Sequence, residues 1–499
     1  MSSHNIINYK TLESYKRIDP EYYQKKFFKI INNLENNRSS PLSEFVSLRK
    51  EKFKKDRANF NYIEISKIDT LTSALESSVI DTINAPSRAQ NILKTNDLIV
   101  SFVRPNRKAL SIITKDQDNF VGTSGLGVYK IDKIEPEYLL AYLKTNIINS
   151  LVSRKSTATE YPAISNEDFI TTPVIVFKDI KDKVNNSVIE CQKYIKKFKT
   201  KYEEANEILY ESTGFKKYKN KNTYKIINSK KVFNFNEKRI DPKFHCIDMD
   251  NFFKNLSNSG SIKKIKDLVS KKITNGVSPK YDDDGEVVLV NSEHLGIHGL
   301  NFGATDRVSK SFFENNQKAK INFENVLIYA TGAYYGRSNI YLENRDTLAG
   351  LDTLILQFDK EICDPYYASL YLNSDIGLTI SKKYFSGSAQ EHLYDRHINE
   401  YPIYIPDDKN IIKKISNLVK ESYDEKQNAF KSLEIAINLI EKKLSKKAKI
   451  KYLKMQIGDV KSTRADITKF KKKFGFSFDY DLNKGIQKFV DWYKNFKKN

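Results

Sequence analysis

The sequence predicts an α+β protein in which two β-rich domains of one fold alternate with two long helices. Three observations support this fold class. Short sequence words recur late in the chain, apolar residues follow heptad spacing after each copy, and short apolar runs bounded by turn residues fill the copies. A chain of 499 residues is also long enough for two or three hydrophobic cores.

The internal duplication rests on two sets of matches. The word KRIDP at residues 16–20 returns at residues 238–242, which is 222 positions later, and an aromatic-rich run follows it both times. The second set lies 229 positions apart and pairs residues 97–100 with 326–329, 136–138 with 365–367, and Pro173 with Pro402. Because this period is longer than that of any solenoid repeat, it predicts two domains of one fold.

Each copy is expected to begin with strands and to end with a helix. Apolar runs at residues 61–66, 286–290 and 325–329 are bounded by Gly, Asn, Asp or Pro, which is typical of short strands. Residues 135–151 and 364–380 have apolar side chains at helical spacing after a proline, a residue suited to the first helical turn.

A long charged helix is predicted after each copy. The first has an unbroken heptad stripe from Val184 to Leu209, and the second has one from Ile412 to Ile440 with polar Ser422 and Lys426 in its middle. About thirty residues of helix extend roughly 45 Å, so we expect the two helices to pair as an antiparallel coiled coil. The alternative is that each helix packs separately on its own domain.

The predicted organisation is therefore a first domain at residues 1–181, a first helix at 182–214, a linker and second domain at 215–406, a second helix at 407–450, and a tail at 451–499.

The composition favours a nucleic-acid partner and a reducing compartment. The net charge is +22, from 84 Lys and Arg against 62 Asp and Glu, which attracts a polyanion, although A- and T-rich coding DNA also yields abundant lysine. The three cysteines have neither zinc-site nor disulfide-framework spacing. The sequence contains neither an apolar leader nor a membrane-spanning run, so we expect a cytoplasmic protein.

Three stretches carry a family resemblance. They are ITNGVSPKY at residues 273–281 with the strand after it, the strand and turn at residues 96–106 and 325–332, and SGSAQEHL at residues 386–393, which leads to YPIYIP at 401–406. The pattern resembles the specificity subunit of type I restriction-modification systems over residues 17–450. The first copy departs from it at residues 156–163, STATEYPA, which lack the Gly and Gln of that loop.

This resemblance implies two target recognition domains that read a bipartite, asymmetric DNA target across a helical spacer. It also implies modification subunits that use S-adenosylmethionine and a restriction subunit that uses ATP and Mg²⁺, all docked on the helices.

Loop residues with basic, amide, hydroxyl or aromatic side chains are the DNA-contact candidates, because such groups bind phosphates and base edges. In the first domain they are Arg104, Asn106, Arg107, Lys108, Arg154, Lys155, Thr157 and Thr159. In the second they are Lys280, Tyr281, Tyr334, Tyr335, Arg337, Lys382, Lys383, Tyr384, Ser388 and Gln390. The helix residues assigned to subunit docking are Val188, Ile195, Phe198, Tyr202, Ile415, Val419, Leu433 and Ile440.

Catalytic motifs are missing from the sequence. It has no glycine-rich cofactor loop that opens a helix, no methyltransferase tetrapeptide, no phosphate-binding loop for ATP, and no metal-ligand spacing among its His and Cys. We therefore expect a non-catalytic subunit without a cofactor or metal of its own. A protein-binding scaffold with duplicated domains is the alternative.

The tail is expected to be unrelated to the rest. Residues 455–493 resemble the C-terminal end of NAD-dependent nucleotide-sugar epimerases, but nothing before them resembles that family's cofactor-binding strand or its Tyr-x-x-x-Lys pair. A fused remnant without enzymatic activity is the favoured interpretation.

Overall fold

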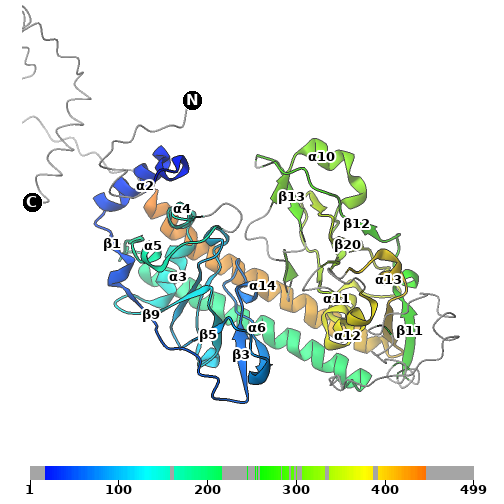
Figure 1. The fold of residues 1–499 in the computed structure, drawn as a ribbon. Helices are drawn as coiled ribbons and strands as arrows, with labels where there is room; N and C mark the ends of the chain where they lie inside the picture. The colour runs from blue at the N-terminus through cyan, green and yellow to red at the C-terminus, as the bar shows by residue number, and fades with distance from the viewer. Residues whose placement is uncertain are drawn as a thin grey trace, which may run out of the picture. The chain divides into compact units, whose positions relative to one another are not determined.

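The computed structural model describes residues 17–157, 162–215, 244, 253, 256, 259–282, 284–291, 294–296, 299–300, 306–331, 336–385 and 392–445 (Figure 1). The chain divides into one compact unit at residues 1–446 and a second at residues 447–499. The predicted tail belongs to the second unit and lies outside the described residues. All elements below belong to the first unit.

The first lobe, residues 17–180, contains two four-stranded sheets, four α-helices and six short 3-10 helices. Its sheets have the orders β2-β9-β6-β7 and β4-β3-β8-β5, and β1 pairs with β10. The strands are β1 (Ser40–Pro41), β2 (Val46–Leu48), β3 (Asn59–Ile63), β4 (Ser78–Asp81), β5 (Ala89–Ile92), β6 (Leu98–Ser101), β7 (Leu110–Ile112), β8 (Val121–Thr123), β9 (Leu126–Ile131) and β10 (Pro173–Val174). The α-helices are α2 (Lys25–Asn36), α3 (Pro136–Lys144), α4 (Asn146–Ser153) and α5 (Asn166–Ile170), and the first 3-10 helix is η1 (Pro20–Tyr23).

The second lobe, residues 259–406, repeats this architecture. Among its described residues the sheet orders are β12-β20-β17-β18 and β16-β13-β19, β11 pairs with β21, and β14 pairs with β15. The strands are β11 (Gly260–Lys264), β12 (Thr274–Asn275), β13 (Val287–Val290), β14 (Leu295–Gly296), β15 (Gly299–Leu300), β16 (Asp306–Val308), β17 (Val326–Tyr329), β18 (Ser338–Ile340), β19 (Thr347–Ala349), β20 (Thr353–Leu356) and β21 (Pro402–Pro406). The helices are α10 (Lys310–Asn315), α11 (Pro365–Asn373), α12 (Asp375–Tyr384) and α13 (Asp395–Asn399).

The strand register corrects the sequence alignment by one position. Asp97 accepts a hydrogen bond from the backbone three residues earlier and precedes β6, and Asn325 does the same before β17. Leu98 pairs with Ile112, and Val326 pairs with Ile340. Asp97 therefore corresponds to Asn325 and not to Val326, because the segment from β6 to α3 is one residue shorter than the segment from β17 to α11.

The helix predicted at residues 135–151 is broken, and so is its counterpart at 364–380. Thr145 and Ser374 adopt extended backbone angles, with ψ of 146° and 164°, and end α3 and α11. Their side-chain hydroxyls then accept hydrogen bonds from the backbone N–H groups of Ile148 and Gly377 and so cap α4 and α12. Apolar spacing continues across the break, which is why it predicts one helix.

Alternating side chains place the central strand of each lobe between two of the lobe's hydrophobic cores. In β6, Leu98 and Val100 pack toward the helices, while Ile99 faces the opposite way into a core between the two sheets. In the second lobe Val326 and Leu327 divide in the same manner.

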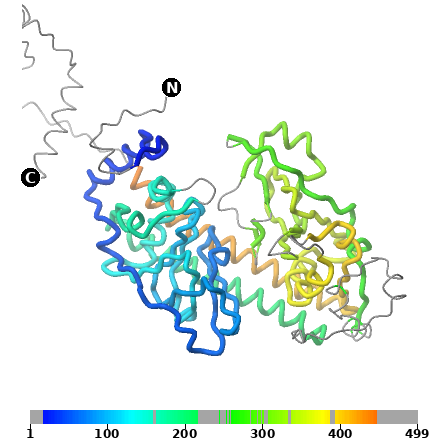
Figure 2. Tube along the Cα trace, in the orientation of Figure 1, coloured from blue at the N-terminus to red at the C-terminus, as the bar shows by residue number. Residues whose placement is uncertain are grey.

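Two long helices join the lobes, α6 (Lys181–Thr213) and α14 (Lys409–Leu444). Val184, Val188 and Cys191 at the start of α6 share the first lobe's core with Leu433 and other residues from the end of α14. The end of α6 shares the second lobe's core with the start of α14. The helices are therefore antiparallel, as Figure 2 also traces, and the predicted α+β fold with paired helices is confirmed. The alternative of separate helices is wrong, because each helix enters both cores.

Lys426, a polar residue within the apolar stripe of α14, forms an ion pair with a loop of the first lobe. The Lys426 ammonium on α14 lies 2.6 Å from the Asp69 carboxylate, and both side chains are about 15 % exposed. Asp69 also accepts hydrogen bonds from the backbone N–H groups of Leu71 and Thr72. Burial alone would raise the Asp69 pKa, but the charge of Lys426 and these hydrogen bonds lower it below its ordinary value.

Residues 69–75, here called the clamp loop, are also attached to two other helices. Lys199 on α6 donates to the Leu75 carbonyl at 2.8 Å, and Lys144 at the end of α3 donates to the Thr70 carbonyl at 2.7 Å. The clamp loop therefore fixes the first lobe to the middle of the helix pair.

Candidate nucleic-acid interface

In the first lobe, two predicted DNA-contact loops lie side by side. After β6 the chain forms the short turn η5 (Pro105–Arg107), and the Arg104 N–H donates to the Pro162 carbonyl at 2.6 Å. The Ile164 N–H donates to the Phe102 carbonyl at 3.0 Å. Arg104 and Lys108 have φ of 50° and 54°, left-handed values that non-glycine residues rarely adopt outside sites where the surroundings impose them.

The second lobe forms the equivalent loop pair. The Leu393 N–H donates to the Ala330 carbonyl at 2.8 Å, and Thr331 bridges to His392. Each lobe thus presents the turn after one central strand against the segment that precedes its last short helix. These two loop pairs are the candidate nucleic-acid interface.

Several predicted contact residues are accessible. Half-buried side chains are Arg104, Arg107, Lys108 and Arg337, and exposed ones are Asn106, Thr157, Lys280, Tyr281 and Lys382. Lys280 and Tyr281 lie before β13 and outside the loop pairs; Tyr281 is 60 % exposed. Thr159, Tyr334, Tyr335, Ser388 and Gln390 lie outside the described residues.

Arg154 does not fit the predicted role, because it is buried against the N-terminal segment. Its guanidinium carbon lies 3.9 Å from the ring centre of Tyr22 and 5.4 and 5.1 Å from those of Phe27 and Phe28. Only 9 % of Arg154 is exposed. A guanidinium held on aromatic faces stabilises the lobe and is withdrawn from phosphates.

Lys383 occupies the same position in the second lobe, with its ammonium 4.7 Å from the ring centre of Phe244. Tyr384 beside it is buried and packs edge-on against the same ring. Phe244 and Tyr22 each lie a few residues after a copy of the KRIDP word, so their ring–cation pairs, Tyr22 with Arg154 and Phe244 with Lys383, hold equivalent places and are here called the two clasps. Lys383 and Tyr384 therefore pack against Phe244 in the structure, and their contact with DNA stays a prediction.

Lys155 is also a structural residue. Its ammonium donates to the Asp168 carbonyl at 2.7 Å and to the Thr171 hydroxyl at 2.5 Å, which satisfies the end of α5. Burial lowers the Lys155 pKa to about 8. A desolvated ammonium already bound to the backbone is a poor phosphate ligand.

The helix residues assigned to subunit docking are not on a free surface. Val188, Phe198, Tyr202, Ile415, Val419, Leu433 and Ile440 are buried between the helices and the lobes, and Ile195 is half-buried. A partner would reach only the outward faces, where Ile189 and Ile435 are 37 % and 55 % exposed. Docking on the helices stays a prediction.

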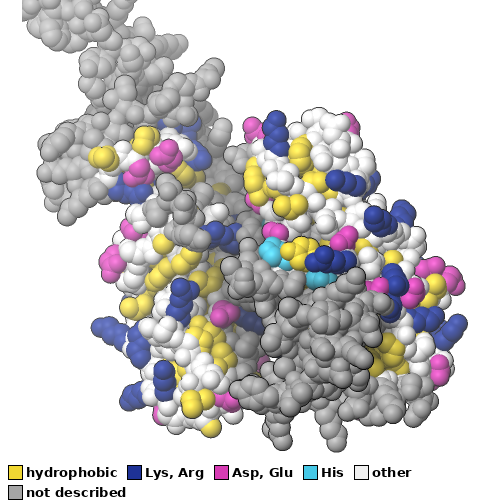
Figure 3. Space-filling view, turned by 45° about the vertical axis from the view of Figure 1, so that its right-hand side comes forward, with side chains coloured by type: hydrophobic (Ala, Val, Ile, Leu, Met, Phe, Trp, Pro, Cys, Tyr) yellow, Lys and Arg dark blue, Asp and Glu magenta, His cyan; other side chains and the backbone are white. Residues whose placement is uncertain are grey.

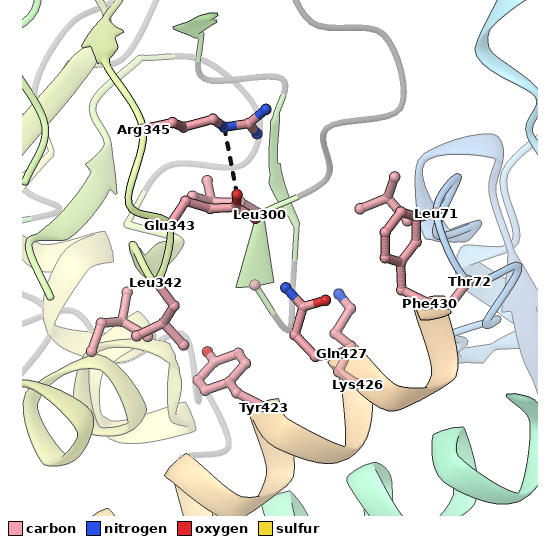
Figure 4. Close-up of a pocket in the computed structure, with 12 residues that line it drawn as sticks. Leu71, Thr72, Leu300, Leu342, Glu343, Arg345, Tyr423, Lys426, Gln427 and Phe430 are labelled. Atoms are coloured by element: carbon pink, nitrogen blue, oxygen red, sulfur yellow. Dashed lines mark ion pairs between the residues drawn. The ribbon is translucent and has the colours of Figure 1, made fainter. Parts of the chain in front are cut away.

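A cavity of about 320 Å³ lies beside α14 between the clamp loop and the second lobe (Figure 4). Leu71 and Phe430 lie at one side of it, while Leu342 and the Glu343–Arg345 ion pair lie at the other. Its volume suits a small molecule and cannot admit a duplex. The candidate interface is therefore the loop pairs and not this cavity.

Two features are absent from the part of the chain that the structure describes. No group of three or more His, Cys, Asp or Glu side chains is placed to hold a metal ion. No described helix combines the length and apolarity that a membrane crossing requires.

Comparison with known proteins gives partial likenesses. No family model matches the chain. A stretch of 57 residues is 46% identical to "Uncharacterized protein MJ1055" of Methanocaldococcus jannaschii and covers 11% of this chain and 18% of that protein. The chain thus matches less than a fifth of that relative's length.

Several solved structures align with most of the chain at low TM-scores. The HsdS subunit from Thermoanaerobacter tengcongensis is 17% identical, with 81% of this chain and 95% of that chain covered and a TM-score of 0.30. The type I restriction-modification S subunit from M. genitalium is 12% identical, with 81% and 94% covered and a TM-score of 0.32. A chain from a study of assembly of the type I R-M system is 16% identical, with 82% and 96% covered and a TM-score of 0.29.

Proposed function

We propose that the chain is the DNA-specificity subunit of a type I restriction-modification complex and reads a bipartite, asymmetric target. The observation that carries this proposal is the placement of two lobes, each with a four-stranded sheet of equivalent strand order, at opposite ends of one antiparallel helix pair. Two readers joined by a rigid spacer can bind two half-sites with a fixed number of unread base pairs between them.

The charge and the loops support DNA as the ligand. The net charge of +22 provides the long-range attraction, and the loop pairs carry exposed or half-buried Arg, Lys, Asn and Thr side chains. The two loop pairs differ in sequence, so the two half-sites would differ too.

The chemistry would belong to partner subunits. In this proposal, modification subunits with S-adenosylmethionine and a restriction subunit with ATP and Mg²⁺ dock on the outward faces of α6 and α14. The complex would act in the cytoplasm, where its DNA lies.

A salt titration with duplex DNA tests the proposal. For a subunit that contacts several phosphates, log K should fall by about 0.9 per phosphate neutralised for each unit of log salt. Lys382→Gln should reduce that slope by about 0.9 without lowering the melting temperature, if Lys382 is one of the contacts. A protein-binding scaffold would bind no duplex at any salt concentration, and that result would reject the proposal.

A further inference from the structure

A cluster of aromatic, His and Arg side chains lies beside the second lobe's loop pair. The ring centres of His392 and Tyr394 are 5.9 Å apart and nearly parallel, and the His397 ring meets Tyr394 edge-on at 5.5 Å. The Arg396 guanidinium carbon lies 5.0 Å from the Tyr394 ring centre. In the view of Figure 3, parts of His side chains are visible beside hydrophobic, basic and acidic side chains, and within this cluster His392 is half-buried and His397 is buried.

The hydrogen bonds in this cluster fix the orientation of the His392 ring. The Thr331 hydroxyl lies 2.9 Å from an Asp352 carboxylate oxygen and 3.0 Å from His392 Nδ1. A carboxylate can only accept, so the single hydroxyl proton goes to Asp352, and the Thr331 oxygen then accepts from Nδ1–H. The neutral ring is left with Nε2 as its acceptor.

The stacked groups also order Arg396. Its Nε donates to His397 Nε2 at 3.4 Å, and its guanidinium lies over Tyr394. A guanidinium group held in this way loses less rotamer entropy when it binds a ligand. Its remaining N–H groups match the O6 and N7 acceptors of guanine.

The first lobe has different chemistry at the same positions. His392, Tyr394, Arg396 and His397 correspond to Ala163, Ser165, Glu167 and Asp168. Ser165 accepts a hydrogen bond from the Asp168 N–H and caps α5.

The second lobe lacks this cap at the equivalent helix, α13. Tyr394 stands at the N-cap position of α13 without a capping hydrogen bond, and it is 45 % exposed. An exposed tyrosine in place of a good cap lowers the stability of the helix end and therefore indicates a role other than folding.

We propose that Tyr394, with the stacked His392 and Arg396, forms a base-edge contact site for the duplex half-site that the second lobe reads. Arg396 donates to a guanine, and His392 Nε2 accepts from an adenine or cytosine amino group in the major groove. This proposal rests on the proposed function and adds to it the residues that set one half of the target.

Three variants test it in the complex purified through a tag on this chain from the cell that makes it. Arg396→Gln and His392→Ala each remove one base contact. Tyr394→Ser removes the stack and restores the cap of the first lobe. Glu167→Gln, at the first-lobe position equivalent to Arg396, is the matched control. Affinity for the wild-type target, the half-sites selected from a random duplex pool and the melting temperature are measured for each.

We expect each of the three variants to lose about tenfold or more in affinity, the loss typical of one base-edge contact. The change in selected sequence should be confined to one half-site, while Glu167→Gln leaves both halves unchanged. Tyr394→Ser should melt at or above the wild-type temperature, which a merely structural tyrosine would not allow.

Two outcomes overturn the inference while the proposed function stands. In the first, wild type selects a bipartite target and the three variants select the same target with unchanged affinity. In the second, Arg396→Gln weakens all duplexes equally, as loss of a phosphate contact would do. If the wild-type complex selects no target, both the inference and the proposed function fall.

Discussion

The two lobes agree where they meet the helix pair and differ where their loops face outward. Tyr138 and Tyr367 hold the same place in α3 and α11, and their hydroxyls donate to equivalent backbone carbonyls, of Ile175 and Tyr404, at 3.0 and 2.7 Å. At an outward position the lobes differ, because the first has Ser165 where the second has Tyr394. Packing has thus kept one fold in both copies, while the loop pairs were free to acquire different chemistry.

The lobes also differ in how they are attached to α14. The first lobe uses the Asp69–Lys426 ion pair. The second lobe approaches the preceding turn of the helix through Gly299, where an added Cβ would lie 3.1 Å from the Tyr423 ring. An ion pair fixes an orientation through charge, whereas a glycine permits close packing of the backbone.

The largest effect on stability is expected from the ion pair. Asp69→Asn leaves the Lys426 ammonium without its carboxylate in a largely dry position, and we expect the free energy of unfolding to fall by about 3 kcal/mol. Chemical denaturation of the full chain measures this loss.

The double variant with Asp69→Asn and Lys426→Gln is the control, because it removes both charges. It should recover part of the loss. Equal destabilisation in the two variants would show that the charge pair contributes little to the attachment of the first lobe.

The next-largest effect is a change of stability with pH, to which the two lobes should contribute differently. Burial lowers the Lys144 pKa to about 8, while the equivalent residue in the second lobe is Asn373, which does not titrate. Between pH 8 and 10 the unfolded chain holds a proton that the folded chain has released, so stability should rise with pH by roughly 1 kcal/mol per pH unit.

Above about pH 10 the buried tyrosines act in the opposite sense, because burial raises the pKa values of Tyr138 and Tyr142. Lys155 has the same sign as Lys144. Lys144→Met should therefore reduce the rise between pH 8 and 10, and the double variant with Lys155→Met should reduce it further. Denaturation midpoints that follow the same pH curve in all three proteins would contradict this assignment.

A smaller effect distinguishes the two clasps. Arg154 contacts three aromatic rings, so Arg154→Met should destabilise the chain by about 1–2 kcal/mol, and Arg154→Lys, which installs the second lobe's residue, by less. Lys383→Met should have the weaker effect of the two Met variants. Arg154→Met should leave the salt dependence of DNA binding unchanged, and a reduced slope for this variant would restore Arg154 as a phosphate contact.

The sequence was informative wherever a pattern repeats along one element. Heptad spacing predicted both long helices, and the repeated words predicted two lobes of one fold. The sequence was uninformative where an interaction joins residues that are distant in the chain. It showed Lys426 only as a polar residue within an apolar stripe, and the structure explains this residue by its ion pair with Asp69. Arg154 looked like a DNA contact because composition alone does not distinguish a guanidinium on a loop from one against aromatic rings.

In the candidate site, too, the local pattern was predictable from the sequence and the contacts between distant residues were not. The loops after β6 and β17 were predicted from the family resemblance of residues 96–106 and 325–332 and from their side-chain types, but the cluster around Tyr394 was missed. Its members come from three segments, with Thr331 and Asp352 far from His392 in sequence. The alternation of His, Tyr and Arg over residues 392–397 was the one local signal.

The most direct test of the central claim lengthens both helices together. Because α6 and α14 are antiparallel, an insertion in one alone would shift their register. We would duplicate residues 193–199 in α6 and residues 423–429 in α14, which repeats one heptad in each and keeps the contacts of both lobes. The methylated target of cells that carry this chain is then read by sequencing. If the two lobes are held on a rigid spacer, the half-sites should stay unchanged and the gap between them should lengthen by up to about three base pairs. A folded, active protein that keeps the original gap would contradict the account.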